Sequence, residues 1–158
     1  MSAVTVNGTT LYYERRGQGP SVLFISGASG DASLWTSVPE TLARDNTIVS
    51  YDRRGNSRSA RQPGVGPSSI DEQADDAAAL LWALDLAPAF VYGSSLGALI
   101  LISLVLRHPE LAHGALFREP PLVAVTSPRQ VTERLKALAA SLATLLTPGA
   151  AIATARTA

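Results

Sequence analysis

The chain opens with two short segments, residues 3–6 and 10–14, in which apolar and polar residues alternate on either side of Asn7-Gly8. Alternation with period two is typical of strands that bury one face, and Asn-Gly is a preferred two-residue hairpin turn. Later segments are continuously apolar, as expected of strands buried on both faces of a parallel sheet: residues 21–26, 47–51, 89–92 and 114–117. The pattern predicts a hairpin followed by a mostly parallel sheet.

Between and after these strands lie segments that favour helices, namely residues 34–43, 70–86, 95–107 and 128–146. In residues 70–86 the apolar positions recur with the helical period. Ser69 and Glu72 have the spacing of a capping box, in which each side chain bonds a free amide of the first turn. Strands that alternate with helices indicate an α/β fold, here with about six strands, flanking helices and an N-terminal antiparallel hairpin.

Gly93-Ser94-Ser95-Leu96-Gly97 joins the strand 89–92 to the helix that begins at Ser95. Gly-x-Ser-x-Gly in this strand–turn–helix context indicates a nucleophilic serine. So sharp a turn needs small flanking residues, lifts the Ser95 hydroxyl clear of the sheet and directs the Leu96 amide toward a developing oxyanion. The alternatives are packing and phosphate binding. Phosphate is disfavoured, because residues 93–97 lack the P-loop lysine and residues 27–30 lack a third glycine.

Five segments occur in the order expected of small bacterial esterase-like proteins: LFISGASG, YDRRGNSRS, VYGSSLGA, RHPE and REPPL. Through them the chain resembles the α/β-hydrolase superfamily. The resemblance implies that Ser95 attacks a small carboxylic ester or similar acyl substrate without a cofactor or metal ion. It also implies that Ala28 donates the second oxyanion amide, beside Leu96.

The serine at position 95 limits the reactions that the resemblance implies. Superfamily dehalogenases and epoxide hydrolases carry Asp at this position, which argues against those activities. Perhydrolases, aminopeptidases and C–C bond hydrolases share the serine and stay open. Ser26-Gly27 stands where many members have His-Gly, and Ser57 replaces a usual glycine in a loop that braces the sheet near the oxyanion loop. In that loop the resemblance gives structural roles to Asp52, Arg53, Arg54 and Ser59.

A serine nucleophile needs a histidine that accepts its proton, and the chain has two, His108 and His113. His108 ends the helix that Ser95 begins, about 20 Å away at 1.5 Å per residue, where it closes the helix end with Arg107. His113 precedes the strand 114–117, at the edge of a parallel sheet opposite the catalytic edge. We expect neither histidine to be the base.

Glu119 follows the strand 114–117, where some superfamily members carry the triad acid, so it is the candidate acid. Alternatively, Arg118 and Glu119 form a pair that braces a hinge. Complete members place the histidine after later strands, which predicts a C-terminally truncated, incomplete hydrolase core. The expected divisions are a core at residues 1–121, the start of a cap-like helical segment at 122–147, and a flexible tail at 148–158.

Composition narrows the chemistry further. The 158 residues include no Cys, which excludes disulfides, thiolate zinc sites and iron–sulfur clusters. Thirteen basic residues balance thirteen acidic ones, so the chain lacks the positive field of a nucleic-acid-binding protein. The apolar segment 96–106 is too short to span a membrane, and the N-terminus lacks a signal-peptide pattern. These features predict a cytoplasmic protein whose partner is a small-molecule acyl substrate.

Several remaining expectations concern packing and surfaces. Trp35 and Trp82 lie beside apolar residues on predicted helices and are expected in the core. Asp75 and Asp76 are adjacent on a helix and point apart, so a solvated face is expected there. A sixth strand without a neighbour would expose the apolar edge 114–117, which predicts a homodimer through that edge. The alternative function is therefore a catalytically silent hydrolase domain that acts as a self-associating or binding module.

Overall fold

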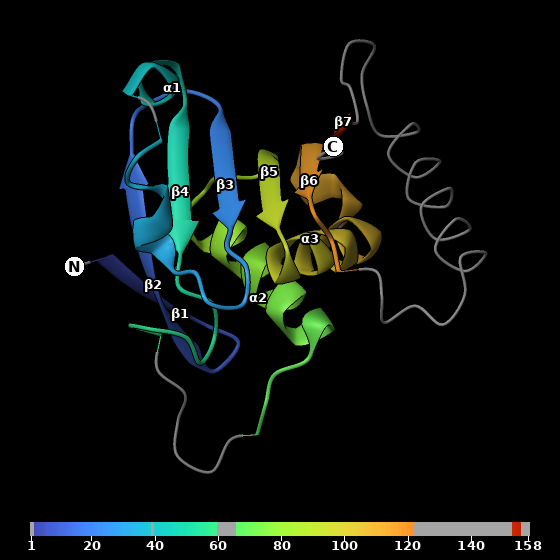
Figure 1. Cartoon of the computed structure of the whole chain (residues 1–158). Helices are drawn as coiled ribbons and strands as arrows, with labels where there is room; N and C mark the ends of the chain where they lie inside the picture. The colour runs from blue at the N-terminus through green and yellow to red at the C-terminus, as the bar shows by residue number, and fades with distance from the viewer. Residues whose placement is uncertain (1, 39, 60–65, 122–152, 156–158) are drawn as a thin grey trace.

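The computed structural model describes residues 2–38, 40–59, 66–121 and 153–155. Its strands form one seven-stranded sheet in the order β1-β2-β4-β3-β5-β6-β7 (Figure 1). β2 runs antiparallel to both β1 and β4, and the remaining neighbours are parallel. In chain order the strands are Ser2–Val6, Thr9–Arg16, Ser21–Ile25, Thr47–Tyr51, Ala89–Ser94, Ala112–Arg118 and Ala153–Ala155.

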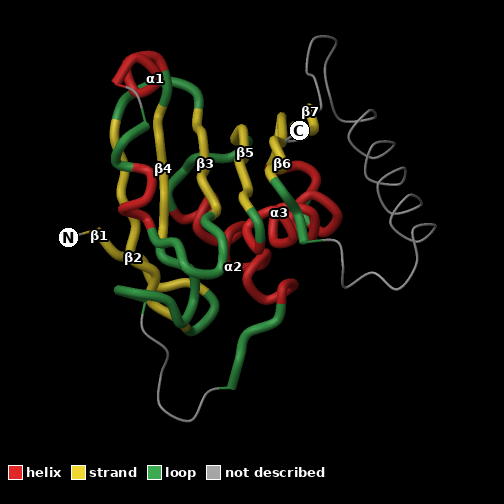
Figure 2. The backbone as a smooth tube through the Cα atoms, viewed as in Figure 1, coloured by secondary structure: helices red, strands yellow, loops and turns green. Residues whose placement is uncertain are grey.

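Two helices, α2 at Ile70–Ala83 and α3 at Leu96–Arg107, lie side by side on one face of the sheet (Figure 2). The shorter helix α1 is Glu40–Asp45, and the 3₁₀ turns η1 and η2 are Ala32–Trp35 and Pro109–Leu111. No helix in the described ranges is long and apolar enough to cross a membrane. The predicted α/β class, with its mostly parallel sheet and N-terminal hairpin, is confirmed.

Local turn and cap residues define the beginnings of several elements. Asn7 and Gly8 have φ values of 46° and 71°, the left-handed geometry that a tight hairpin turn requires. The Ser69 side chain accepts a hydrogen bond from the Glu72 amide at 3.0 Å and so caps α2. Both features are readable from the sequence because they depend on neighbouring residues alone.

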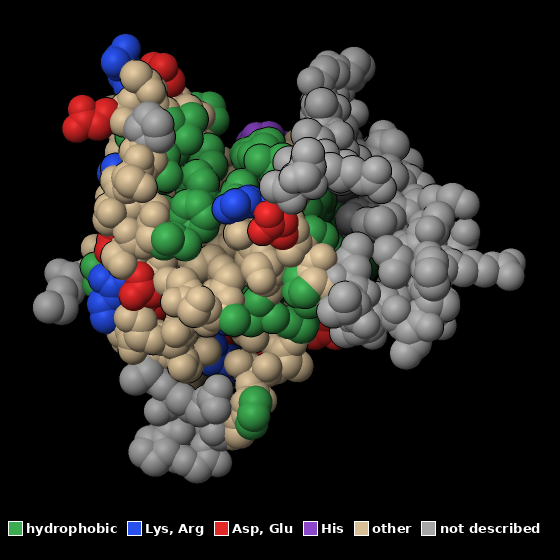
Figure 3. Space-filling view, viewed as in Figure 1, with side chains coloured by type: hydrophobic (Ala, Val, Ile, Leu, Met, Phe, Trp, Pro, Cys, Tyr) green, Lys and Arg blue, Asp and Glu red, His purple; other side chains and the backbone are tan. Residues whose placement is uncertain are grey.

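β3 shows why the parallel strands are continuously apolar. Leu23 and Ile25 are fully buried in the main core, between the sheet and the helices α2 and α3. Val22 and Phe24 point to the opposite face and form a second cluster with Ile48. Figure 3 shows hydrophobic side chains gathered on this second face, which is turned away from α2 and α3. Because both faces of β3 pack against apolar groups, no polar alternation appears in its sequence.

Two segments differ from the predicted elements. Residues 34–43, expected as one helix, contain the end of η1 and the start of α1 instead. Pro39 stands between the two, and a proline lacks the amide that a continuous helix needs. β7 occupies part of the expected tail and pairs in parallel with Leu116–Arg118, so the predicted exposed edge of β6 is wrong over those residues. The predicted helix 128–146 and the cap-like segment lie outside the described residues.

Two side-chain expectations are also wrong. Trp82 is 61% exposed, because it lies on the outer side of α2, directly after the buried pair Leu80-Leu81. Asp76 is 1% exposed, because Arg54 and the hairpin turn cover its side of the helix. Trp35 packs as expected, with its ring centroid 4.7 Å from that of Phe24 and 5.2 Å from that of Tyr92.

Candidate active site

Ser95 lies where β5 turns sharply into α3, at the carboxyl end of the strand. Its φ and ψ angles are 52° and −119°, a conformation that residues with a side chain rarely adopt. Its amide donates to the Arg118 carbonyl at 2.9 Å, and its carbonyl accepts from the Ala98 amide at 2.9 Å. Hydrogen bonds to β6 and α3 therefore hold the strained turn, and the residue itself is exposed.

Glycine on either side of this turn lets α3 approach the sheet closely. A Cβ at Gly93 would lie 2.5 Å from the Gly97 carbonyl oxygen and 2.9 Å from the Ala98 Cα. A Cβ at Gly97 would collide with the Ile25 carbonyl and lie 2.8 Å from the carbonyl oxygen of Ser26. These neighbours are backbone atoms that cannot rotate away. Both glycines of the motif are therefore required by packing at the ends of β3 and β5.

The loop after β3 lies against Ser95. A Cβ at Gly27 would be 3.2 Å from the Ser95 Cβ and 3.8 Å from its Oγ. Ala28 follows directly, and its amide donates no hydrogen bond to any group in the part of the chain described. Leu96 is the first residue of α3, so its amide has no acceptor within the helix. The three predicted residues thus come from two adjacent segments, and both amides are available to an anion.

Side chains from the loop after β4 hold the loop after β3 in place. Arg53 Nη2 donates to the carbonyls of Gly27 and Ala28 at 2.9 and 3.0 Å. Asn56 Nδ2 donates to the Gly30 carbonyl at 2.7 Å. These bonds turn three carbonyl groups of the loop toward the protein. The loop is therefore positioned by the fold before any substrate arrives.

Ser26, which stands where many members of the resembled superfamily have histidine, holds the start of the same loop. The residue is fully buried. Its Oγ accepts a hydrogen bond from Trp35 Nε1 at 2.7 Å and donates one to the Asp31 carbonyl at 3.1 Å. The replacement side chain therefore bridges η1 and the loop within the fold.

Asp52 is fully buried and anchors the loop after β4. It accepts hydrogen bonds from the Ala32 amide at 2.8 Å and from the Arg58 amide, Nε and Nη2 at 2.9, 2.7 and 2.9 Å. Burial alone would raise the pKa of this carboxyl, but the hydrogen bonds outweigh burial and lower the pKa below its ordinary value. Ser59 Oγ donates to the Asp52 carbonyl at 2.7 Å and accepts from the Tyr12 amide at 2.8 Å. Asp52 and Ser59 are thus bonded within the fold.

Both histidines lie away from Ser95. His108 ends α3, and its Nε2 is 2.7 Å from Asp75 Oδ1. Arg107 also bonds Asp75, and together Arg107 and then His108 hold the pKa of that carboxyl below its ordinary value. His113 is the second residue of β6, at the amino end of the strand, with Nδ1 3.3 Å from the Pro88 carbonyl. The structure therefore brings neither imidazole to the nucleophile.

Glu119 directly follows β6, whose last residue Arg118 is paired with Ser94 of β5. It therefore lies at the same edge of the sheet as Ser95. Its φ is 49°, the residue is exposed, and its carboxylate makes no hydrogen bond or ion pair with the described residues. The assignment of Glu119 as the triad acid stays a prediction.

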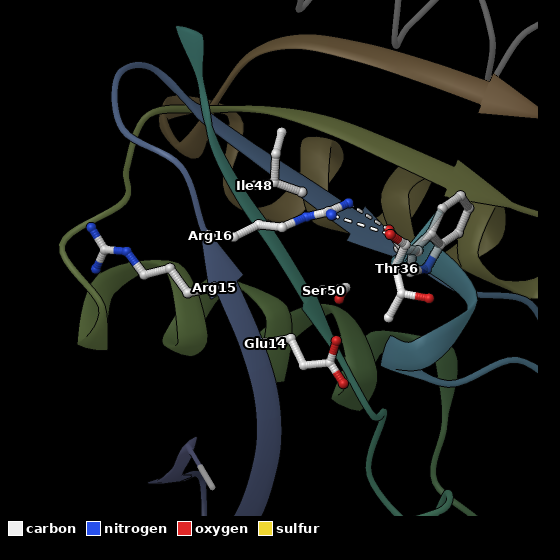
Figure 4. Close-up of a pocket in the computed structure, with 7 residues that line it drawn as sticks. Glu14, Arg15, Arg16, Thr36, Ile48 and Ser50 are labelled. Atoms are coloured by element: carbon white, nitrogen blue, oxygen red, sulfur yellow. Dashed lines mark hydrogen bonds between the residues drawn. The ribbon is translucent and has the colours of Figure 1, made fainter. Parts of the chain in front are cut away.

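A pocket of about 150 Å³ lies apart from Ser95, beside β2 and β4 (Figure 4). Arg16 reaches into it and donates to the carbonyls of Trp35, Thr36 and Val38 at 2.8, 3.1 and 3.0 Å. These contacts fix the end of η1. The guanidinium of Arg16 is therefore taken up by backbone carbonyls in and after η1.

The sequence gives no indication of Asn56 and Gln73, although hydrogen bonds of both residues help to hold the loop after β3. Gln73 Oε1 accepts from Arg53 Nη1 at 2.8 Å, and Asn56 binds the loop directly. Neither residue belongs to a motif with a local chemical meaning. Their contacts arise only when α2 and two loops pack together, so no nearby sequence signal could have found them.

Residues 20–147 match a family model described as "alpha/beta hydrolase fold". The chain is 41% identical to the uncharacterized hydrolase YraK of Bacillus subtilis (strain 168) over 118 residues, 75% of this chain and 44% of YraK. It is 33% identical to the zearalenone hydrolase of Bionectria ochroleuca over 120 residues, 74% of this chain and 46% of that protein. It thus spans less than half the length of these two relatives.

Among solved structures, Est816 is described as an N-acyl homoserine lactone degrading enzyme. It matches with a TM-score of 0.68 and 29% sequence identity, over 93% of this chain and 66% of that chain.

Proposed function

The chain belongs to the α/β-hydrolase family, and from this premise we propose that it carries the nucleophile and oxyanion-binding part of a serine hydrolase. One observation carries the proposal. The exposed Ser95 stands at φ 52°, with the loop of Ala28 packed against it and the first amide of α3 beside it. A strained, exposed hydroxyl next to two available backbone amides is what acyl transfer requires.

In the proposed reaction Ser95 Oγ attacks the carbonyl carbon of the substrate while a base takes its proton. The carbonyl oxygen becomes an oxyanion that accepts hydrogen bonds from the Ala28 and Leu96 amides. When the tetrahedral intermediate collapses, the leaving alkoxide takes the proton from the base, and the acyl group stays on Ser95. Water then attacks the acyl group by the same route, which releases the carboxylic acid and restores Ser95.

The residues described around Ser95 include no histidine that could act as the base. Because His108 and His113 are bonded elsewhere, we assign the proton transfer to an imidazole that neither of them supplies. Glu119 lies at the correct edge of the sheet to orient such a group.

The proposed substrate is a small carboxylic ester or lactone. Est816 is described as degrading an N-acyl homoserine lactone, and the family includes the other hydrolases named above. In an ester and in a lactone the same carbonyl carbon bears an oxygen leaving group. A single nucleophile and oxyanion site therefore serves both.

The test is hydrolysis of p-nitrophenyl acetate by the chain, with and without added imidazole. Without imidazole we expect slow turnover, at most about 10³-fold over water, because oxyanion binding alone remains. Imidazole should raise the rate of the wild-type chain above its own background, whereas Ser95→Ala should follow the background. Ser94→Ala is the matched control and should behave like the wild type, because Ser94 lies in β5.

The second candidate function is a catalytically silent module that binds a partner or a second copy. The distance of both histidines from Ser95 favours it. If the wild-type and Ser95→Ala chains hydrolyse the ester at equal rates at every imidazole concentration, the hydrolase proposal is refuted. Sedimentation velocity would then show whether the chain self-associates.

A further inference from the structure

Arg53 is a buried cation without a carboxylate partner in the described part of the chain. It is 5% exposed, whereas the neighbouring Arg54 pairs with Asp76 and Arg58 pairs with Asp52. Its Nε is buried and makes no hydrogen bond to the described residues. Burial lowers the pKa of the guanidinium. Burying an unpaired guanidinium costs free energy unless its other N–H groups, those of Nη1 and Nη2, make hydrogen bonds.

Those remaining donors are directed at the loop after β3. Nη2 donates to the carbonyls of Gly27 and Ala28 at 2.9 and 3.0 Å. Nη1 donates to Gln73 Oε1 at 2.8 Å, and Gln73 Nε2 is 3.4 Å from the Ser69 carbonyl at the start of α2. The guanidinium is thus held by the first turn of α2 while it holds two successive peptide groups.

The peptide plane links these carbonyls to the oxyanion site. The Gly27 carbonyl and the Ala28 amide belong to one trans peptide group, so they point in opposite directions. A hydrogen bond that fixes the carbonyl on the Arg53 side therefore fixes the Ala28 N–H on the side away from it. Donation to the carbonyl by a cation also polarises the peptide and strengthens its N–H as a donor.

We propose that Arg53 is a positioning residue for the oxyanion hole, which orients and strengthens the Ala28 amide through the Gly27 carbonyl. This inference rests on the proposed function, in which Ala28 binds the oxyanion. It goes beyond the structural role implied for Arg53 by sequence, because it assigns the cation an effect on the transition state. The same fork sets the Ser29 amide, since the Ala28 carbonyl is the second acceptor.

Lysine at this position tests the idea, because one ammonium group keeps the charge but lacks the planar fork that spans two carbonyls and Gln73. Arg54→Lys is the matched control. It makes the same change one residue away, in a side chain that is also largely buried. Arg54, unlike Arg53, is ion-paired, and it donates no hydrogen bond to Gly27 or Ala28. Loss of stability common to both variants is thereby separated from an effect on the site.

The first readout is the rate at which an activated methylphosphonate ester phosphonylates Ser95 in the presence of added imidazole, which supplies the base. The reaction is followed by intact mass spectrometry with Ser95→Ala as the blank. The phosphoryl oxygen occupies the oxyanion position in this reaction. One oxyanion donor is worth about 10²–10³ in rate, so weakening it should slow Arg53→Lys by about 10- to 100-fold relative to Arg54→Lys. Equal labelling rates in the two folded variants would overturn the proposal.

The second readout is the ¹³C chemical shift of the Gly27 and Ala28 carbonyl carbons, which reports their hydrogen bonds without any reaction. We expect both signals to move upfield in Arg53→Lys and to stay in place in Arg54→Lys. If the wild-type chain is not labelled at Ser95, the proposed hydrolase function fails by itself. The carbonyl shifts then decide the positioning inference, and unchanged shifts in Arg53→Lys would overturn it.

Discussion

Gly93→Ala is the sharpest test of the turn that presents Ser95. The substitution adds one methyl group in β5, at a glycine whose φ is not positive, so the backbone can accept alanine without torsional strain. The new Cβ would lie 2.5 Å from the Gly97 carbonyl oxygen, 2.8 Å from its carbonyl carbon and 2.9 Å from the Ala98 Cα. All three contacts are far inside the 3.4 Å at which such contacts become ordinary.

Two effects oppose each other in this variant. Replacing glycine by alanine restricts the unfolded chain and gains about 0.4–1 kcal/mol where the native backbone accepts alanine. Overpacking a tight interior costs about 1–3 kcal/mol, and a clash with backbone atoms that cannot rotate away belongs at the upper end of that range. The clash therefore wins, and we expect a net loss of about 2 kcal/mol.

Urea unfolding measures this loss. With a denaturant slope of about 2 kcal/mol per molar, the midpoint should fall by about 1 M. Gly66→Ala is the matched control, because a Cβ at Gly66 meets nothing within 4 Å. A Gly93→Ala midpoint equal to that of Gly66→Ala would refute the reasoning. Since α3 must retreat from β5 to make room, labelling of Ser95 by the phosphonate should also slow in Gly93→Ala alone.

At pH 7 we expect Asp52→Asn to cost about 2–4 kcal/mol, because the buried site loses the charge that binds Arg58 and the Ala32 amide. The fold lowers the pKa of Asp52, so the full cost is present above the ordinary carboxyl pKa of 3.8 and shrinks as the pH falls through the lowered pKa. A cost in urea unfolding that stays constant between pH 7 and pH 3 would contradict the assignment. Ser69→Ala should lower stability by about 1 kcal/mol through loss of the α2 cap, whereas Ser68→Ala should change it by less than about 0.5 kcal/mol, and equal effects in the same assay would count against the cap.

The parts of the fold that the sequence predicts are those that depend on neighbouring residues. The hairpin turn at Asn7, the cap at Ser69 and the sharp turn at Ser95 each need a few consecutive residues with particular backbone angles. The continuously apolar strands were also predictable, because burial on both faces leaves no polar position. The apolar residues of the segment 34–43 favour one helix, but Pro39 lacks the amide that a continuous helix needs, and the structure has η1 and α1 instead.

The residues of the candidate site also differ in whether a local sequence pattern reveals them. Ser95 and Leu96 are neighbours, so a five-residue pattern reveals both. Ala28 is separated from them by more than 60 residues and could be assigned only through the resemblance. The support from Gln73 and Asn56 has no pattern at all. It exists because α2 and the loop after β4 happen to meet the loop after β3.

Arg53 and Arg54 show the same limit of local sequence at a single pair of residues. They are adjacent and chemically identical, yet Arg53 bonds the loop after β3 and Arg54 bonds Asp76. Arg54 lies in the turn that follows β4, and the sequence of this turn does not indicate which of the two arginines meets the loop after β3. The choice is made by α2, because Gln73 and Asp76 are three residues apart on one face of that helix and accept one guanidinium each. A shift of α2 by one residue would misplace both arginines, and with them the peptide group that presents the Ala28 amide.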